Sequence, residues 1–427
     1  MIKWYFCLRE MHMEGNVKKT RESNFELLRI VAMVGIIAYH LVLHHMDYNR
    51  FALVNPEDGS NFYHLETIQI IYTFGQIGNT LFILITGYFL ISKKNINVVK
   101  PGIKLLNRSY FLAIILLGLS FVFDRFDMPV SSNSNIHMAL NGWWFIGYYI
   151  FIIVFAKYVL NDFLAGLTKR NYLNFLLVVT LLLSFTEFFN ILTNLKVQNF
   201  AIGILVYSIG GFIRLYDPLK DVKATTLIIC LLAFFFIQVI QYKVNLNISM
   251  RDFYKDPSMQ FARSPFTNVL RSPSILFTLC SVSIFELVSR LKLGNNRLIN
   301  AISATTFTVY LLHESSFFRG IQFKGIPLPN RLGILKDVST KVLSDNPGKG
   351  SVVPIDNAES WINLKDYLNI SQVFEDRGVK LGLFYMLILI VVIFALGILC
   401  EIFIKFINKV IKSLFYNDFI GMKRRLE

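Results

Sequence analysis

The sequence predicts an all-α fold, namely a polytopic transmembrane helical bundle of about ten spans with both termini in the cytoplasm. Of the 427 residues, 54% are hydrophobic and only 17% are charged, which is less charge than a soluble protein of this length carries. Apolar runs close to the length that crosses a bilayer recur along the whole chain. Lysine and arginine gather in short loops between these runs, as is typical of cytoplasmic loops.

The predicted spans follow from these apolar runs. They cover residues 25–45, 67–91, 109–123, 142–160, 172–190, 199–215, 224–242, 269–289, 300–318 and 381–408. The basic clusters that precede the first span and follow the second, fourth, sixth and eighth all fall on one side of such a bundle. We assign that side to the cytoplasm.

This arrangement divides the chain into three parts. Residues 1–24 form a cytoplasmic N-terminal segment that is too polar for a signal peptide. Residues 25–408 form the membrane domain, and residues 409–427 form a basic cytoplasmic tail. The longest connection, 319–380, is predicted on the extracytoplasmic side. Within it, SWINLKDYLNI has the pattern of a short amphipathic helix at the membrane surface.

Charge and cysteine usage exclude two classes of function. The formal net charge is +15, but the basic residues are spread over several loops, so we do not expect nucleic-acid binding. The four cysteines are far apart, and their spacing fits neither a disulfide framework nor a zinc site.

One arginine and one histidine stand out in the first span. Arg29 lies near the start of LLRIVAMVGIIAYHLVLHH (residues 27–45), and His40 follows eleven positions later. Eleven residues are close to three helical turns, so the two side chains share a face and lie about 16 Å apart along the axis. Ionisable groups inside a bilayer are costly and usually functional.

These two residues suit different parts of a reaction. His40 can act as a general base or attack an acyl group itself, and Arg29 can bind phosphate. The simpler alternatives are a histidine that only bonds a neighbouring helix and an arginine that anchors its own helix. His40 and His44 are four residues apart and share a face, but no carboxylate motif accompanies them, so no metal site is predicted.

The basic loop after the second span is a candidate for donor binding. Lys104 and Arg108 are four residues apart and can share a helix face. Near Arg29 they would complete a phosphate-binding cradle, although many such loops only set the topology.

Polar and aromatic residues of other spans are candidates for substrate binding. Asn79 belongs to the second span, Trp144 and Tyr148 to NGWWFIGYY at the start of the fourth, and Tyr310 and His313 to TFTVYLLHES in the ninth. Each has a simpler interpretation in helix packing or in an interfacial aromatic belt. The second span also holds small residues that allow close helix approach, which are Gly75, Gly78 and Gly87.

Taken in order, these segments resemble the acyltransferase-3 family of bacterial integral-membrane O-acyltransferases. The first span matches the family's arginine, small residue and histidine with Arg29, Ala32 and His40. LFILITGYFL resembles a family stretch that ends in Ser-Gly-aromatic-Phe, with Thr86 in place of serine. WWFIGYY and TFTVYLLH resemble the family's tryptophan-tyrosine and tyrosine-leucine-histidine motifs, so the resemblance covers about residues 22–318.

The resemblance implies a substrate pair and a location. The donor would be acetyl-coenzyme A or another acyl-coenzyme A, with no permanently bound cofactor. The acceptor would be a hydroxyl of a cell-envelope glycan or its lipid-linked precursor, and the protein would lie in the bacterial cell membrane, with a homo-oligomer left open. The family often has two arginines three residues apart where Lys104 and Arg108 are four apart. Some members also carry a C-terminal esterase-like domain, and we expect none in this chain.

Two other functions fit the same composition. A transporter or flippase for lipid-linked glycans would also have many spans and buried polar residues, although no inverted repeat is visible in the sequence. A non-catalytic scaffold for envelope assembly would not need Arg29 or His40.

Overall fold

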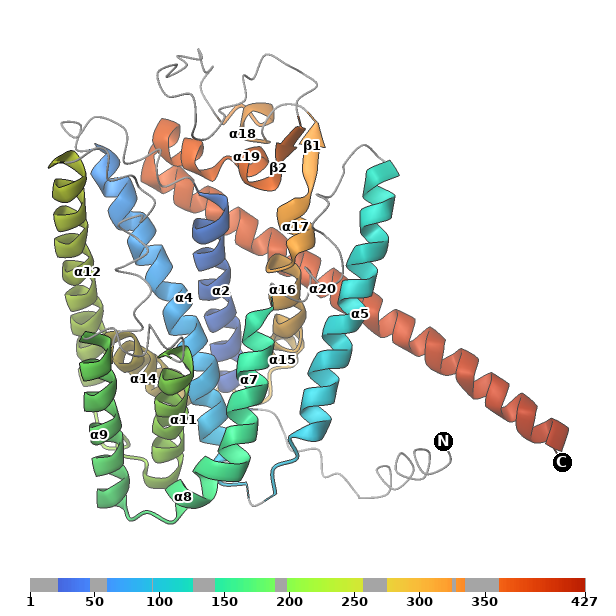
Figure 1. Cartoon of the computed structure of the whole chain (residues 1–427), viewed down its shortest axis with the longest axis horizontal. Helices are drawn as coiled ribbons and strands as arrows, with labels where there is room; N and C mark the ends of the chain where they lie inside the picture. The colour runs from blue at the N-terminus through green and yellow to red at the C-terminus, as the bar shows by residue number, and fades with distance from the viewer. Residues whose placement is uncertain are drawn as a thin grey trace.

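The computed structural model describes residues 22–46, 60–93, 95–125, 143–188, 198–255, 275–324, 328–334 and 361–426. These residues are almost entirely helical (Figure 1). The longer helices are α2 (Ser23–His45), α4 (Ser60–Leu90), α5 (Val99–Arg125), α9 (Lys169–Phe188), α11 (Gln198–Tyr216), α12 (Ala224–Lys255), α14 (Ile275–Ser289) and α20 (Ile370–Leu426). The fourth predicted span is a continuous run of α7 (Trp144–Phe155), the π-helical turn η1 (Ala156–Leu160) and α8 (Asn161–Ala165).

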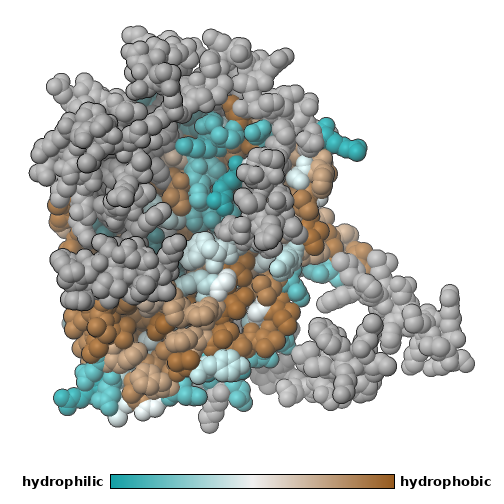
Figure 2. All heavy atoms as spheres, in the orientation of Figure 1, coloured by the Kyte–Doolittle hydropathy of each residue, from teal (hydrophilic) through white to brown (hydrophobic). Residues whose placement is uncertain are grey.

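Length and composition make this a multi-pass membrane protein. Six helical segments of the described chain are long and apolar enough to cross a membrane, and two shorter apolar helices begin at Ala224 and Ile275. Figure 2 shows a band of hydrophobic surface over the lower half of the molecule, with hydrophilic residues along its lower edge. The predicted helical membrane bundle is therefore confirmed, whereas the total of ten spans and the side of each terminus stay predictions.

Helices α2 and α4 form the centre of the bundle and pack closely against each other (Figure 1). The approach depends on small residues. A Cβ atom added to Gly78 of α4 would lie 2.5 Å from the carbonyl oxygen of Ala32 on α2. The prediction that glycines of the second span allow close approach is confirmed at this position. The tight contact fixes α2, and with it Arg29 and His40, against the rest of the fold.

The ninth predicted span, 300–318, is not one helix. It is divided into α15 (Arg297–Ser303), α16 (Thr306–His313) and α17 (Ser316–Gly320). The second break follows from local hydrogen bonding, because the Ser315 side chain accepts a bond from Phe318 N and begins a new helix there. The first part of this segment is tied to the start of α2, where the Ser23 hydroxyl donates to Asn300 Oδ1 at 3.0 Å.

A small cap follows α17 at one end of the bundle (Figure 1). It contains the antiparallel strands β1 (Gln322–Lys324) and β2 (Trp361–Asn363), in which Phe323 pairs with Ile362, and the short helices α18 (Leu328–Arg331) and α19 (Leu364–Leu368). The helix predicted for SWINLKDYLNI is wrong for its first part. Residues 361–363 pair with β1, and the Asn363 side chain caps α19 by accepting a bond from Asp366 N.

The last helix, α20, crosses the bundle at an angle and extends beyond it (Figure 1). It contains one bend, at Gly378, whose φ of 77° favours glycine. Beyond the bend the helix continues to Leu426. The described part of the predicted tail at 409–427 is therefore continuous with the last span. Much of the connection 319–380 and most of segment 1–24 lie outside the described residues.

Candidate active site

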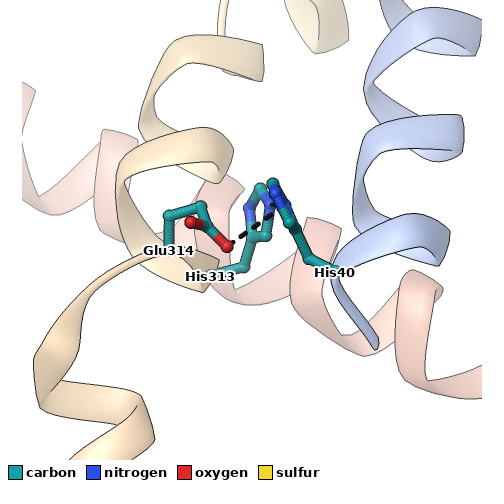
Figure 3. A group of neighbouring side chains, drawn as sticks. All are labelled: His40, His313 and Glu314. Carbon is teal, nitrogen blue, oxygen red and sulfur yellow. Dashed lines mark hydrogen bonds and ion pairs between the residues drawn. The ribbon is translucent and has the colours of Figure 1, made fainter. Parts of the chain in front are cut away.

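Two histidines and one glutamate meet between α2 and the end of α16 (Figure 3). His40 Nδ1 lies 2.9 Å from His313 Nε2 and 3.1 Å from Glu314 Oε1. His40 is 8% exposed and Glu314 only 4% exposed. A buried carboxylate beside a buried imidazole is costly unless the two are paired. The structure therefore places a histidine–carboxylate pair inside the bundle.

The hydrogen bonds define which nitrogens carry protons. His313 Nδ1 lies 2.7 Å from the Val309 carbonyl oxygen, and a carbonyl only accepts, so this nitrogen carries a proton. His313 Nε2 then holds a lone pair and accepts a bond from His40 Nδ1. His40 Nε2 is left with its own lone pair, and no hydrogen bond from the described part of the chain engages it. The arrangement presents one basic nitrogen.

Two further residues surround the carboxylate. His44, one turn beyond His40 on α2, has its Nε2 3.3 Å from the same oxygen of Glu314. Its ring stacks on that of His40 at 5.5 Å between centroids. Arg319 donates to the backbone carbonyl of Glu314 at 2.8 Å. These contacts fix the short non-helical stretch that carries Glu314.

Aromatic residues connect the start of α7 to this site. The Tyr310 ring lies 6.0 Å from His313 and 5.9 Å from Phe145, and Phe145 lies 5.6 Å from Tyr148. The half-exposed Trp144 ring lies 5.7 Å from Tyr148. The four predicted residues of the fourth and ninth spans are thus brought together in one row of rings that leads away from His40.

Arg29 lies toward the other end of α2 and already has an acidic partner. Its Nη1 contacts Glu26 Oε1 at 2.6 Å, with 31% of the Arg29 side chain exposed. The second oxygen of Glu26 accepts a short bond from the Ser303 hydroxyl at the end of α15. Arg29, through Glu26, and His40, through His313, are therefore both connected to the α15–α16 segment.

The predicted cradle of Arg29, Lys104 and Arg108 is not assembled as three free cations. The Lys104 side chain is exposed on α5. Arg108 forms an ion pair with Glu401 of α20, and its guanidinium lies 6.0 Å from the centroid of the Phe307 ring. The predicted role of Arg108 in donor binding therefore competes with a buried partner inside the protein.

Asn79 is half-buried on α4, and no hydrogen bond in the described chain connects it to the histidine cluster.

The cluster itself has the donors for a metal ion. One ligand atom each from His40, His313 and Glu314 lie within 4.8 Å of one another. Imidazole and carboxylate groups are the ligands that zinc prefers, together with thiolate. The carboxylate absent from the sequence pattern around His40 is supplied here by Glu314, directly after the end of α16.

A cavity of about 440 Å³ opens beside the start of α2, on the side that faces α4, α11 and α14. Its charged lining residues balance in number and are Glu22, Asp217, Glu286, Arg214, Lys220 and Arg290. Arg290 donates to Glu286 and to the carbonyls of Leu219 and Val222, so most of its donors are already used. The cavity therefore offers little excess positive charge for a phosphate.

Sequence reasoning missed three residues around the site. Glu314 and His44 are not among the predicted site residues, yet Glu314 contacts His40 and His44 contacts Glu314. Trp143 is not among them either, but its indole donates to the Leu311 carbonyl at 2.8 Å and fixes the start of α7 to α16. The one available signal for Glu314 was its position directly after a histidine in an apolar run.

The fold and this cluster define a class: a multi-pass helical membrane protein with a histidine–carboxylate pair buried between its helices. A family model described as an acyltransferase domain matches residues 22–333. The chain therefore belongs to the acyltransferase-3 family and is a membrane acyltransferase. No significant match to a curated protein or to a solved structure was found.

Proposed function

We propose that the protein transfers an acyl group, in the first instance acetyl, from acyl-coenzyme A to a hydroxyl of a cell-surface polysaccharide or its lipid-linked precursor in the bacterial cell membrane. The observation that carries this proposal is the free Nε2 of His40, whose Nδ1 donates to His313 and lies 3.1 Å from the Glu314 carboxylate. A carboxylate behind a histidine base is the arrangement that activates a hydroxyl in acyl transfer.

The proposed reaction begins at this nitrogen. His40 Nε2 takes the proton of the acceptor hydroxyl as its oxygen attacks the thioester carbonyl. The carbon–sulfur bond then breaks, and the coenzyme A thiolate takes the proton from the imidazolium. Glu314, 3.1 Å from His40 Nδ1, stabilises the positive charge that forms in between. A variant of this path in which Nε2 is first acylated uses the same residues.

Donor and acceptor would approach from opposite directions. Arg29 lies about 16 Å along the α2 axis from His40, a distance that an extended pantetheine arm can bridge. The half-exposed Arg29 and the exposed Lys104 are the proposed contacts to the coenzyme's phosphates. On the other side, the row formed by Trp144, Tyr148 and Tyr310 offers aromatic faces to a sugar ring.

The direct test measures labelled acetyl transfer in membrane vesicles that contain His40→Ala. We expect a loss of at least about a hundredfold in rate, because general base catalysis contributes about 10² to 10⁴. His45→Ala is the matched control, since His45 is the last residue of α2 and its ring lies beside that of His44, at 6.4 Å between centroids. Wild-type rates in a normally produced His40→Ala protein would refute the role of His40.

The same vesicles distinguish acyl transfer from transport. Movement of a lipid-linked glycan in the absence of any acyl-coenzyme A would favour a flippase. Loss of acetyl mass from the surface polysaccharide of cells without the protein would support the proposed reaction and identify the acceptor.

A further inference from the structure

A second buried carboxylate lies outside the histidine cluster, in the apolar part of α20. Glu401 is 3% exposed. Its Oε2 forms an ion pair with Arg108 of α5 and accepts a bond from the Thr308 hydroxyl of α16 at 2.6 Å. Its Oε1 lies 3.4 Å from Lys405, one turn further along α20. One side chain therefore joins three helices.

Burying the Glu401 carboxylate in an apolar helix is energetically unfavourable, which indicates that the residue has a function. A charged residue at the centre of an apolar helix is unfavourable in a membrane and is normally retained for a specific task. Glu401 lies beyond residue 333, where the match to the acyltransferase family ends. Its partners Arg108 and Thr308 lie within that match. The contact thus attaches the last helix to the acyltransferase domain.

The attachment is directly connected to the candidate active site through α16. Gly397 precedes Glu401 by four residues, so the two lie on one face of α20. At Gly397 the helix passes so close to Val309 that an added Cβ would collide with its side chain. The carbonyl of Val309 accepts the bond from His313 Nδ1. Two consecutive residues of α16 are therefore held against α20, namely Thr308 and Val309. The second of them also carries the carbonyl that fixes the tautomer of His313.

We propose that Arg108 and Glu401 are positioning residues, which hold α16 against α20 so that His313 and Glu314 stay aligned with His40, and that Arg108 does not bind the donor's phosphates. The kinetic part of this inference rests on the proposed acyl transfer. Arg108 is committed to Glu401 and to the face of Phe307, whereas Lys104, one turn earlier on α5, is exposed.

Steady-state kinetics separate positioning from donor binding. We expect Arg108→Gln and Glu401→Gln each to lower kcat by about tenfold or more while KM for acetyl-coenzyme A changes by less than about twofold. The exchanged pair Arg108→Glu/Glu401→Arg should recover part of that loss. Lys405→Gln is the matched control, because Lys405 contacts the same carboxylate but is 66% exposed, and it should leave kcat unchanged. A large rise in KM in Arg108→Gln alone would overturn the proposal.

A second measurement does not depend on activity. Melting temperatures of the wild type, both single variants and Arg108→Gln/Glu401→Gln in detergent form a double-mutant cycle. We expect the double variant to melt close to the single variants, because each single change already breaks the pair; additive losses would overturn the proposal. If a single variant does not fold, Thr308→Val removes only the hydroxyl bond, and it should lower kcat without raising KM. If the double-mutant cycle shows the expected non-additive losses but the wild type transfers no acyl group, the proposed function is refuted while the structural role of the Arg108–Glu401 pair stands.

Discussion

His40 of α2 donates a hydrogen bond to His313 of α16 across 273 residues of sequence. The bond depends on the Val309 carbonyl, which accepts from His313 Nδ1 and so leaves His313 Nε2 as the acceptor for His40. His313 therefore determines the tautomer of His40 and leaves its Nε2 as the basic atom. We therefore expect the two histidines to have different tasks, one in the reaction and one in orientation.

Replacing the orienting histidine should cost less than replacing the base. We expect His313→Ala to lower kcat by about tenfold to a hundredfold, less than His40→Ala, because Glu314 still contacts His40 Nδ1. His313→Gln, whose amide can still accept from His40, should recover part of the rate. Acetyl transfer in vesicles measures all three variants. A His313→Ala rate equal to the wild type would contradict this role.

Neutralising the carboxylate should affect the chemical step more than donor binding. Glu314→Gln keeps the size of the side chain but removes the charge that stabilises the imidazolium. We expect kcat to fall by about a hundredfold, with little change in KM for acetyl-coenzyme A. Glu375→Gln, a change of the same type on α20, serves as the control and should leave kcat unchanged. The idea fails if both glutamine variants behave alike.

Zinc should inhibit the protein reversibly. The donor atoms of His40, His313 and Glu314 lie within 4.8 Å of one another, and a bound ion would occupy the lone pairs on which the hydrogen bonds depend. We expect inhibition by Zn²⁺ that a chelator reverses, and no inhibition by Mg²⁺, which prefers oxygen ligands. The residual activity of Glu314→Gln should require a higher Zn²⁺ concentration for half-maximal inhibition. Unchanged zinc sensitivity in that variant would place the inhibition elsewhere.

Close packing of α2 on α4 should make Gly78→Ala destabilising. The new methyl group would lie 2.5 Å from the Ala32 carbonyl oxygen, and overpacking of this kind costs about 1–3 kcal/mol. Gly118→Ala in α5 is the matched control, because its Cβ meets nothing within 4 Å. Alanine is also the better helix former, by about 1 kcal/mol. Thermal melting in detergent should show a lower midpoint for Gly78→Ala only; equal midpoints would contradict the packing argument.

Much of the fold could be predicted from the sequence, because apolar length and helical periodicity are local properties. The first predicted span, 25–45, corresponds to α2 at Ser23–His45, and the sixth, 199–215, to α11 at Gln198–Tyr216. The division of 300–318 cannot be predicted in this way, since an apolar run does not reveal where a serine side chain starts a new helix.

The candidate site could be predicted only in part. His40 was identifiable because one ionisable residue in an apolar helix is conspicuous. Its partnership with Glu314 was not, because the pair is brought together by the packing of distant segments. The same holds for Arg108. The basic residues around it favour binding of the donor's phosphates, but its observed partner, Glu401, is almost three hundred residues away in the sequence.

The break between α16 and α17 connects the cap directly to the candidate active site. Glu314 occupies the break itself, and Arg319 of α17 reaches back to the Glu314 carbonyl. Three residues later the chain enters β1, so less than three turns of polypeptide separate the carboxylate from the two-stranded sheet. A displacement of this sheet would be transmitted through α17 to the Glu314 backbone, and so to the carboxylate that lies 3.1 Å from His40 Nδ1.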